Sequence, residues 1–213
     1  MPMPAAVAAR PRDARGYPVP AITPWEDGEP RFAATGVART YLCAVERRCS
    51  ICALPIQPGP VWRVVGGSEA DAIDEALAAG REYRNAAATV EAPGHRACML
   101  YAAIVCPYLA RPTARRGEAA EAADLTVHRG SSRGLGGAVV GFAGVEYRYQ
   151  DVMLFRFAGL CEYRRHELGE EHLDALAAAV AAEVADGDRP PAYLMADEAA
   201  ADRRYAEYLA RPT

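Results

Sequence analysis

The sequence has no long hydrophobic run, because no stretch of about 18 consecutive apolar residues occurs anywhere along the chain. We therefore expect no transmembrane helix. The first 20 residues, MPMPAAVAARPRDARGYPVP, also lack the continuous apolar core that a signal peptide needs. These absences predict a cytoplasmic protein without membrane contact. In that compartment, cysteines serve as metal ligands or buried thiols more often than as disulfides.

A basic surplus is also missing. The chain has 24 Lys and Arg residues against 28 Asp and Glu residues, and its formal net charge is −4. Nucleic-acid-binding proteins generally carry excess positive charge that displaces counterions from phosphates. Short arginine clusters, such as Arg47-Arg48, have acidic neighbours, which is typical of a solvated surface. The composition therefore argues against nucleic acid as a partner.

The first half of the chain predicts a tail followed by helices and one strand. Residues 1–20 are rich in proline and arginine, so we expect them to be disordered. Ser68 is expected to cap the helix over Ser68–Gly80, and Leu77 is expected on the inner face of that helix. Apolar spacing and Pro or Gly breaks predict, in order, a helix over Thr35–Arg48, a strand over Val61–Val65, a helix over Ser68–Gly80 and a helix from His95 to about Val105.

The second half predicts strands and then two alanine-rich helices. The expected strands are Leu125–His128, Ala138–Phe142, Val145–Tyr149, Val152–Phe157 and Leu160–Arg164. The helices are expected over about Glu170–Ala185 and Met195–Ala210. The sequence therefore predicts an α+β fold. A treble-clef-like zinc-binding region at residues 21–115 precedes an antiparallel sheet and C-terminal helices at residues 120–213, and the two regions pack as one unit.

Two short motifs carry the strongest chemical signal. Cys49 and Cys52 form a Cys-x-x-Cys pair before a turn at Pro55, which predicts a zinc knuckle. His95 and Cys98 are one turn apart at the start of a predicted helix, whose dipole favours a thiolate. Treble-clef zinc modules have the same order of elements: a knuckle, then extended segments, then a ligand pair at the start of a helix. We therefore predict one Zn²⁺ ion on these four residues. The alternatives are a redox Cys-x-x-Cys pair and four buried residues without a metal.

The remaining cysteines give weaker signals. Cys106 follows Cys98 by eight residues, which places it about 80° around a helix and about 12 Å along its axis. We therefore expect a buried thiol there rather than a fifth ligand, and we expect the same of Cys43 and Cys161. His172 is expected at the surface, because it follows two glutamates in a helix.

The segment RGSSRGLGG over residues 129–137 could bind an anion through its backbone N–H groups. It matches no phosphate-binding loop and is typical of a hairpin turn. His128, which precedes it, is the one isolated histidine that we keep as a site candidate. Tyr147, Tyr149 and Arg156 could line a pocket, although packing on the sheet is the expected role.

Three segments, WEDGEPRF, ERRCSICALPI and EAPGHRACMLYAAIVCPYLARP, resemble a set of uncharacterised actinobacterial and phage proteins. Those proteins carry RRCWxCGxPL-like and PPSHxxCxxYAxxxCPxLxRP-like segments. The resemblance covers residues 16–115 and implies the same four zinc ligands, with Cys106 in the Cys-Pro position. Ala53 replaces a glycine of the pattern, and an acidic helix replaces a cysteine-containing stretch. No activity is assigned to the group, so the resemblance implies no reaction.

These observations favour a closed, structural Cys₃His zinc site, because all four ligands come from the protein. The predicted function is a binding or interaction module for a protein or small-molecule partner. The alternative is an enzyme in which zinc is either the catalytic ion or a structural ion. Such an enzyme could belong to an actinobacterial biosynthetic pathway. A nucleic-acid-binding zinc module is a third interpretation, which the acidic balance disfavours. The sequence contains no recognisable Ser-His-Asp or Cys-His catalytic pattern, so it identifies no catalytic residues.

Overall fold

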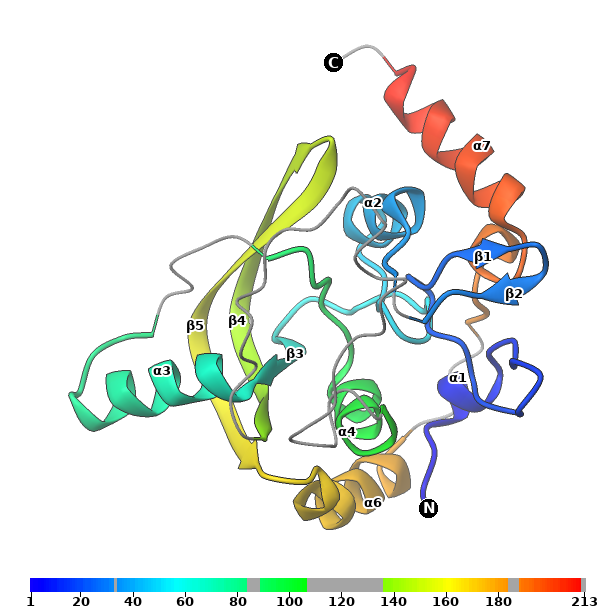
Figure 1. Ribbon diagram of the computed structural model, residues 1–213. Coiled ribbons are helices and arrows are strands. Elements are labelled where there is room, and N and C mark those ends of the chain that lie inside the picture. Colours follow the sequence, from blue (N-terminus) through cyan, green and yellow to red (C-terminus); the bar gives the residue numbers. More distant parts are fainter. Residues whose placement is uncertain (33, 84–88, 107–135, 184–187, 212–213) are drawn as a thin grey trace.

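A three-stranded antiparallel sheet with strand order β3-β4-β5 lies at the centre of the protein (Figure 1). The computed structural model describes residues 1–32, 34–83, 89–106, 136–183 and 188–211. The strands span Val61–Gly66 for β3, Gly137–Gln150 for β4 and Val152–His166 for β5. The mixed helix and sheet architecture and the antiparallel pairing are as the sequence predicts.

The last four of the five strands predicted in the second half of the chain merge into two, β4 and β5. Gly144 pairs with Ala158 in the middle of the β4–β5 hairpin. Small residues at this point interrupt the alternating pattern, and a nearby β-bulge shifts the register between Gly141 and Phe142 without ending either strand, so one strand looks like two in the sequence. The predicted strand Leu125–His128 lies outside the described residues, as do residues 129–135 of the Gly-rich segment.

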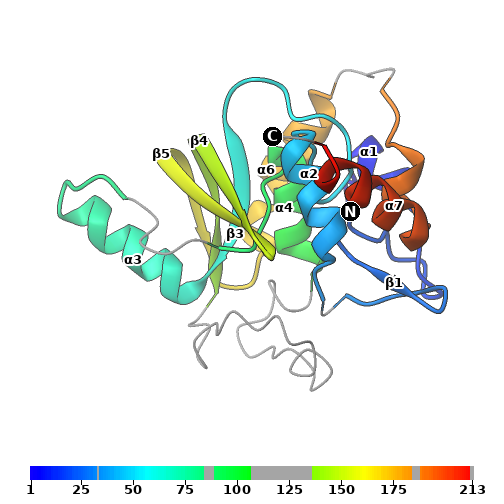
Figure 2. The ribbon, with the colours of Figure 1, turned by 90° about the horizontal axis from the view of Figure 1, so that it is seen from above.

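The helices surround this sheet. In chain order the longer ones are α2 over Val37–Val45, α3 over Gly67–Ala78, α4 over Arg96–Val105, α6 over Leu173–Ala181 and α7 over Glu198–Leu209. Short elements are α1 over Ala5–Ala8, the strands β1 and β2 over Trp25–Glu26 and Glu29–Pro30, and the 3₁₀ helices η2 and η3 over Glu170–His172 and Ala192–Leu194. α3 lies on one side of the sheet and α4 with α2 on the other (Figure 2).

Two details of α3 differ from the sequence prediction. Its N-cap is Gly66, so Ser68 lies inside the helix rather than at its start. Leu77 is 47% exposed, whereas Ala70, Ile73 and Ala76 are buried. The buried face is turned toward the sheet, and the outer end of the helix extends beyond the sheet (Figure 1).

The prediction of a disordered tail over residues 1–20 was wrong, because this segment is anchored by a buried arginine. Val7 and Val19 are buried, and Arg10 is only 3% exposed. The Arg10 guanidinium donates to the carbonyl oxygens of Val19 at 3.0 Å and Leu194 at 2.7 Å. Leu194 is far away in the sequence, so composition alone could not reveal the anchor.

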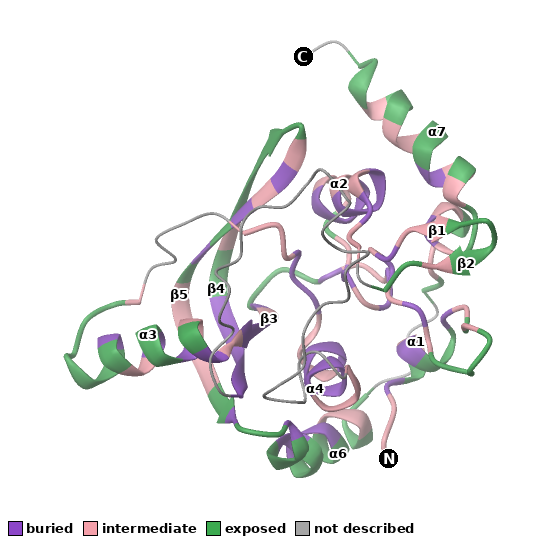
Figure 3. Ribbon diagram, viewed as in Figure 1, coloured by how far each residue is buried: buried purple, intermediate pink, exposed green. Residues whose placement is uncertain are grey.

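The largest buried cluster is built around the sheet and includes residues of α3 on one side and of α4 on the other (Figure 3). It joins sheet residues such as Val139 and Phe142 with Leu100 of α4 and with the cysteines of both predicted zinc motifs. A second buried cluster lies beneath α2 and α7, around Leu42 and Leu194. Among the described residues, no helix combines the length and the apolar character that crossing a membrane requires.

Candidate metal centre

Cys49 and Cys52 lie in a tight turn between α2 and β3. The Cys49 N–H donates to the carbonyl oxygen of Leu54 at 2.9 Å, and the Ala53 N–H donates to that of Cys49 at 2.9 Å. Ala53 has a φ of 67°, in the left-handed region that glycine adopts most easily. This turn directs both thiols to the same side of the chain, as a metal knuckle requires.

His95 and Cys98 approach the same point from the start of α4. His95 is the N-cap of α4, and Cys98 is in its first turn. The preceding Gly94 exchanges backbone hydrogen bonds with Trp62 of β3 at 2.9 and 3.0 Å. The backbone N–H of Ser50 donates to the carbonyl oxygen of Pro93 at 3.0 Å. The two ligand pairs are therefore held together by direct backbone contacts.

The four side chains converge on one point. Their ligand atoms all lie within 4.8 Å of one another, and the group consists of Cys49, Cys52, His95 and Cys98, which we call the Cys₃His cluster. The Nδ1 atom of His95 is 3.4 Å from the Cys52 Sγ and 3.9 Å from the Cys98 Sγ. A tetrahedral ion with ordinary metal–sulfur and metal–nitrogen bonds needs a sulfur–nitrogen distance of roughly 3.6 Å. The cluster therefore has the dimensions of a tetrahedral metal site.

The outer nitrogen of the histidine ring has a fixed partner. The Nε2 atom of His95 is 3.0 Å from the carbonyl oxygen of Pro55. A carbonyl can only accept, so Nε2 carries the proton and donates. The Nδ1 atom then faces the three sulfur atoms. Burial lowers the pKa of His95, but hydrogen bonds to Cys49 and Cys52 outweigh it and raise that pKa to about 11, so a metal ion would replace the Nδ1 proton when it binds.

Negative charge is favoured on one of the three sulfur atoms, that of Cys49, whose hydrogen bonds raise the pKa of the Cys52 and Cys98 thiols. Burial opposes ionisation of Cys49, but hydrogen bonds from Cys52, Cys98 and His95 outweigh it and hold the pKa of Cys49 well below its usual range. The backbone N–H of His95 also points at the Cys49 Sγ at 3.4 Å. The thiolate is the form that binds a metal, so the cluster is prepared for a cation.

The structure therefore brings together all four residues that the sequence singles out, and they could hold a metal ion. Among the described residues, no other group of three or more His, Cys, Asp or Glu side chains does so. His128 lies outside the described residues.

The other cysteines follow the sequence prediction only in part. Cys43 is buried as expected, and burial raises the pKa of its thiol. Cys106 caps the end of α4 and is half-buried. Cys161 is exposed, so the expectation of a buried thiol was wrong. It is the extra residue of a β-bulge, because its neighbours Leu160 and Glu162 pair with Phe142 and Gly141 respectively.

His172 was expected at the surface, but it is 1% exposed and contacts a second buried histidine. Its Nε2 atom is 2.8 Å from the Nδ1 atom of His166. Gly169, with a φ of 81°, turns the chain between the end of β5 and η2 and brings the rings together. Sequence reasoning missed this pair, although the glycine between the two histidines is a signal for such a turn.

Comparisons with protein-family models, curated proteins and solved structures found no match to this chain. The kinship with the actinobacterial and phage proteins therefore stays a prediction. The chemistry of the cluster follows from its residues and geometry.

Proposed function

We propose that the Cys₃His cluster holds one structural zinc ion in a treble-clef-like arrangement, within a protein that acts as a binding module. The convergence of the four ligand atoms within 4.8 Å carries this proposal. Zinc favours tetrahedral sets of sulfur and nitrogen ligands, whereas magnesium and calcium favour oxygen. The order of the knuckle, β3 and the start of α4 along the chain supports this arrangement, with α3 inserted between β3 and α4.

The surroundings of the cluster favour a structural ion over a catalytic one. A catalytic zinc keeps one coordination position open for water or substrate. Here three cysteines and one histidine can complete the tetrahedron, and none of the three thiols is more than 2% exposed. A general acid or base is also missing, since among the described residues no Asp or Glu joins the group. The ion would therefore crosslink the chain rather than activate a substrate.

The proposed working role is recognition of a protein or a small molecule by the surface that this crosslink stabilises. The cluster ties the knuckle and the start of α4 to the buried core of the sheet. None of the six cysteines forms a disulfide, which suits a reducing compartment such as the cytoplasm, where thiolates remain available as ligands.

Elemental analysis of the purified protein tests this proposal. We expect one zinc per chain in the wild type and a large loss in the Cys52→Ser variant. Cys161→Ser is the matched control, because Cys161 is exposed and lies outside the cluster. A wild type without zinc would refute the metal site, and full zinc content in Cys52→Ser would refute the ligand assignment.

A further inference from the structure

A pocket of about 210 Å³ lies beside the knuckle, between the end of α2 and the β4–β5 hairpin. A cavity of about 150 Å³ is large enough for benzene, and sites for drug-sized ligands have volumes of about 300–1,000 Å³. The pocket therefore suits a ligand with one or two rings. None of the four residues of the Cys₃His cluster lines it.

One wall of the pocket is aromatic. Tyr147 and Phe155 are direct cross-strand partners in the β4–β5 hairpin, so their side chains lie on the same face of the sheet. Both line the pocket, together with Val145 and with the apolar residues Ile56 and Val61. Phe155 is 1% exposed and Tyr147 is 50% exposed, which places the tyrosine at the opening and the phenylalanine inside. A flat ring packed against this wall would gain aromatic contacts.

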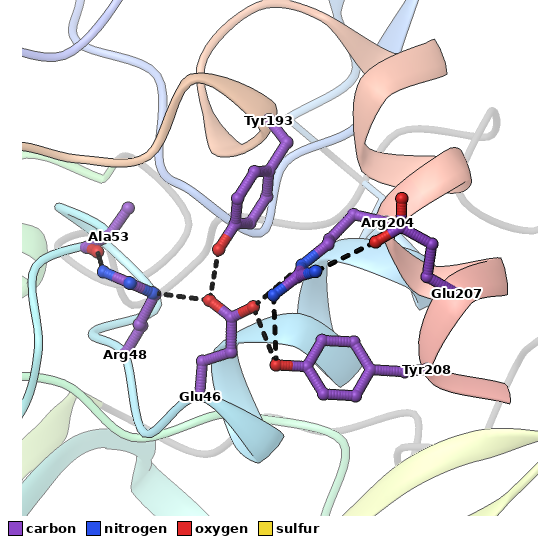
Figure 4. Close-up of polar contacts among 7 residues, drawn as sticks. All are labelled: Glu46, Arg48, Ala53, Tyr193, Arg204, Glu207 and Tyr208. Atoms are coloured by element: carbon purple, nitrogen blue, oxygen red, sulfur yellow. Dashed lines mark hydrogen bonds and ion pairs between the residues drawn. The ribbon is translucent and has the colours of Figure 1, made fainter. Parts of the chain in front are cut away.

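The charge at the pocket has one sign. Among the described residues that line it, Arg47 and Arg48 are charged and no carboxylate is present. Arg48 is already neutralised, because its Nε atom donates to the Glu46 carboxylate at 2.8 Å (Figure 4). Arg47 is therefore the residue that supplies the pocket with a positive charge that no carboxylate neutralises.

Arg47 is exposed, and neutral acceptors hold its guanidinium. The Nε atom donates to the carbonyl oxygen of Ile56 at 3.0 Å, and Nη2 donates to those of Gln57 at 3.3 Å and Gly59 at 3.4 Å. In the part of the chain that the structure describes, no ion pair neutralises it. Its φ of 49° is in the left-handed region, which a residue other than glycine seldom adopts.

The end of α2 also borders the pocket, and the partial negative charge of a helix C-terminus opposes an anion. The last carbonyl groups of α2 are already occupied. They accept hydrogen bonds of 2.7–3.1 Å from the backbone N–H groups of Glu46, Arg47 and Arg48. This opposing contribution is therefore reduced, and the charge on Arg47 dominates at the opening.

We propose that this pocket binds a small aromatic carboxylate, with its ring packed against the wall formed by Tyr147 and Phe155 and its carboxylate at Arg47. The aromatic wall selects the ring, the volume limits its size, and the arginine selects an anion. This ligand class rests on the binding role proposed above and makes it specific.

Two probes of the same shape test the charge requirement: 2-naphthoate and the neutral 2-naphthylmethanol. We expect naphthoate to bind with a Kd of about 1 mM or tighter in an NMR titration. The alcohol is expected to bind about fivefold more weakly, because it lacks the ion pair. Arg47→Gln should weaken naphthoate binding by about the same factor and leave the affinity for the alcohol unchanged. Arg148→Gln is the matched control, since Arg148 is exposed on β4 and does not line the pocket.

Arg47 also donates hydrogen bonds to the loop after the knuckle. Further variants are therefore needed to separate an effect on ligand binding from an effect on folding. Arg47→Lys keeps the charge and should retain most of the naphthoate affinity. Val145→Phe fills the pocket from one wall and should abolish binding of both probes. Zinc content is measured on every sample. Zinc-loaded wild type that binds no naphthoate would overturn the pocket proposal and leave the structural zinc proposal intact. Equal affinity for the two probes, or unchanged naphthoate affinity in Arg47→Gln, would overturn the carboxylate assignment.

Discussion

Gly94 lies directly against the Cys₃His cluster and leaves no room for a side chain. A Cβ atom at this position would lie 2.9 Å from the Cys49 Sγ and 2.5 Å from the Met99 Cε. The methyl group of Met99 ends a flexible side chain and can move, but Cys49 is fixed by the knuckle. Gly94 cannot withdraw, because both of its backbone groups pair with Trp62.

Gly94→Ala is therefore expected to weaken zinc binding by about 10-fold or more, as changes next to metal ligands do. Overpacking should also lower the free energy of unfolding by about 1–3 kcal/mol. Competition with a chelator measures the affinity, and urea unfolding measures the stability. Gly144→Ala is the matched control, since a Cβ at Gly144 meets nothing within 4 Å. Equal zinc affinity in the two variants would contradict this account of Gly94.

A second prediction at this scale concerns the buried histidine pair. Burial, and then the charges on His166 and Arg164, lower the pKa of His172 from 6.5 to about 4. The unfolded chain therefore takes up this proton more readily than the folded one. Its contribution to stability is complete above pH 6.5 and is lost as the pH falls from 6.5 towards 4, by at most about 3 kcal/mol.

Urea unfolding between pH 7 and pH 4 checks this prediction. Carboxylates also titrate near the lower limit of this range, so the slope between pH 6.5 and pH 5 is the informative part. His172→Gln removes the titrating group and should flatten that slope. Identical slopes in the wild type and the variant would show that His172 does not control acid stability.

At the scale of elements, α7 is held to the body by polar contacts more than by apolar burial. Ala201 is its one buried residue, and the helix extends away from the sheet (Figure 1). Glu46, at the end of α2, accepts hydrogen bonds from Tyr208 of α7 at 3.1 Å and from Tyr193 of η3 (Figure 4). Arg204 of α7 adds an ion pair with Glu46 at 3.4 Å. A single carboxylate therefore joins α2 to both C-terminal elements.

Glu46→Gln should loosen the C-terminal half of α7 selectively, because the Arg39–Glu198 ion pair at 2.6 Å still joins α2 to the start of that helix. The amide keeps an acceptor but loses the charge that attracts Arg204, so we expect about 1–2 kcal/mol less protection of α7 amides. Hydrogen exchange measures this loss, with the amides of β4 as the internal reference. Glu207→Gln is the matched control, because it also removes an ion pair with Arg204 but its side chain is 60% exposed. Equal exchange in the two variants would contradict the special role of Glu46.

For the whole molecule, the metal cluster is part of the main core. Cys49, Cys52 and Cys98 belong to the same buried cluster as the central residues of β4 and α4. Without a cation, the negative charge favoured on Cys49 raises the pKa of the Cys52 and Cys98 thiols, so ionisation of all three buried sulfur atoms is opposed. An ion on this cluster would therefore stabilise the sheet and α4 together.

Removal of zinc with a chelator is thus expected to lower the stability of the whole protein. A ligand at about 1,000 times its Kd contributes about 4 kcal/mol, so the thermal midpoint should fall substantially. Circular dichroism measures the midpoint before chelation, after it, and after re-addition of Zn²⁺ or Mg²⁺. Zn²⁺ alone should restore it, and Cys52→Ser should respond to neither ion. An unchanged midpoint after complete zinc removal would argue against a structural ion.

Features that depend on a few neighbouring residues could be predicted from the sequence. The ligand pairs Cys49–Cys52 and His95–Cys98 are such features, because spacings of three residues place both atoms together in a turn or a helix start. The positions of α2, α3 and α4 follow from apolar periodicity and from Pro and Gly breaks. Their ends were less predictable, as the capping of α3 by Gly66 shows.

Local backbone geometry fixes the mixed helix and strand content, most of the helices and the two halves of the candidate metal site, so the sequence predicts these features. How the distant parts of the chain meet depends on tertiary packing. It brought Arg10 to Leu194, Glu46 to Tyr208 and Tyr147 to the pocket beside Arg47. It also buried His172 and exposed Cys161. These contacts join segments far apart in the chain, and their free energy depends on burial and on a partner that no local pattern specifies.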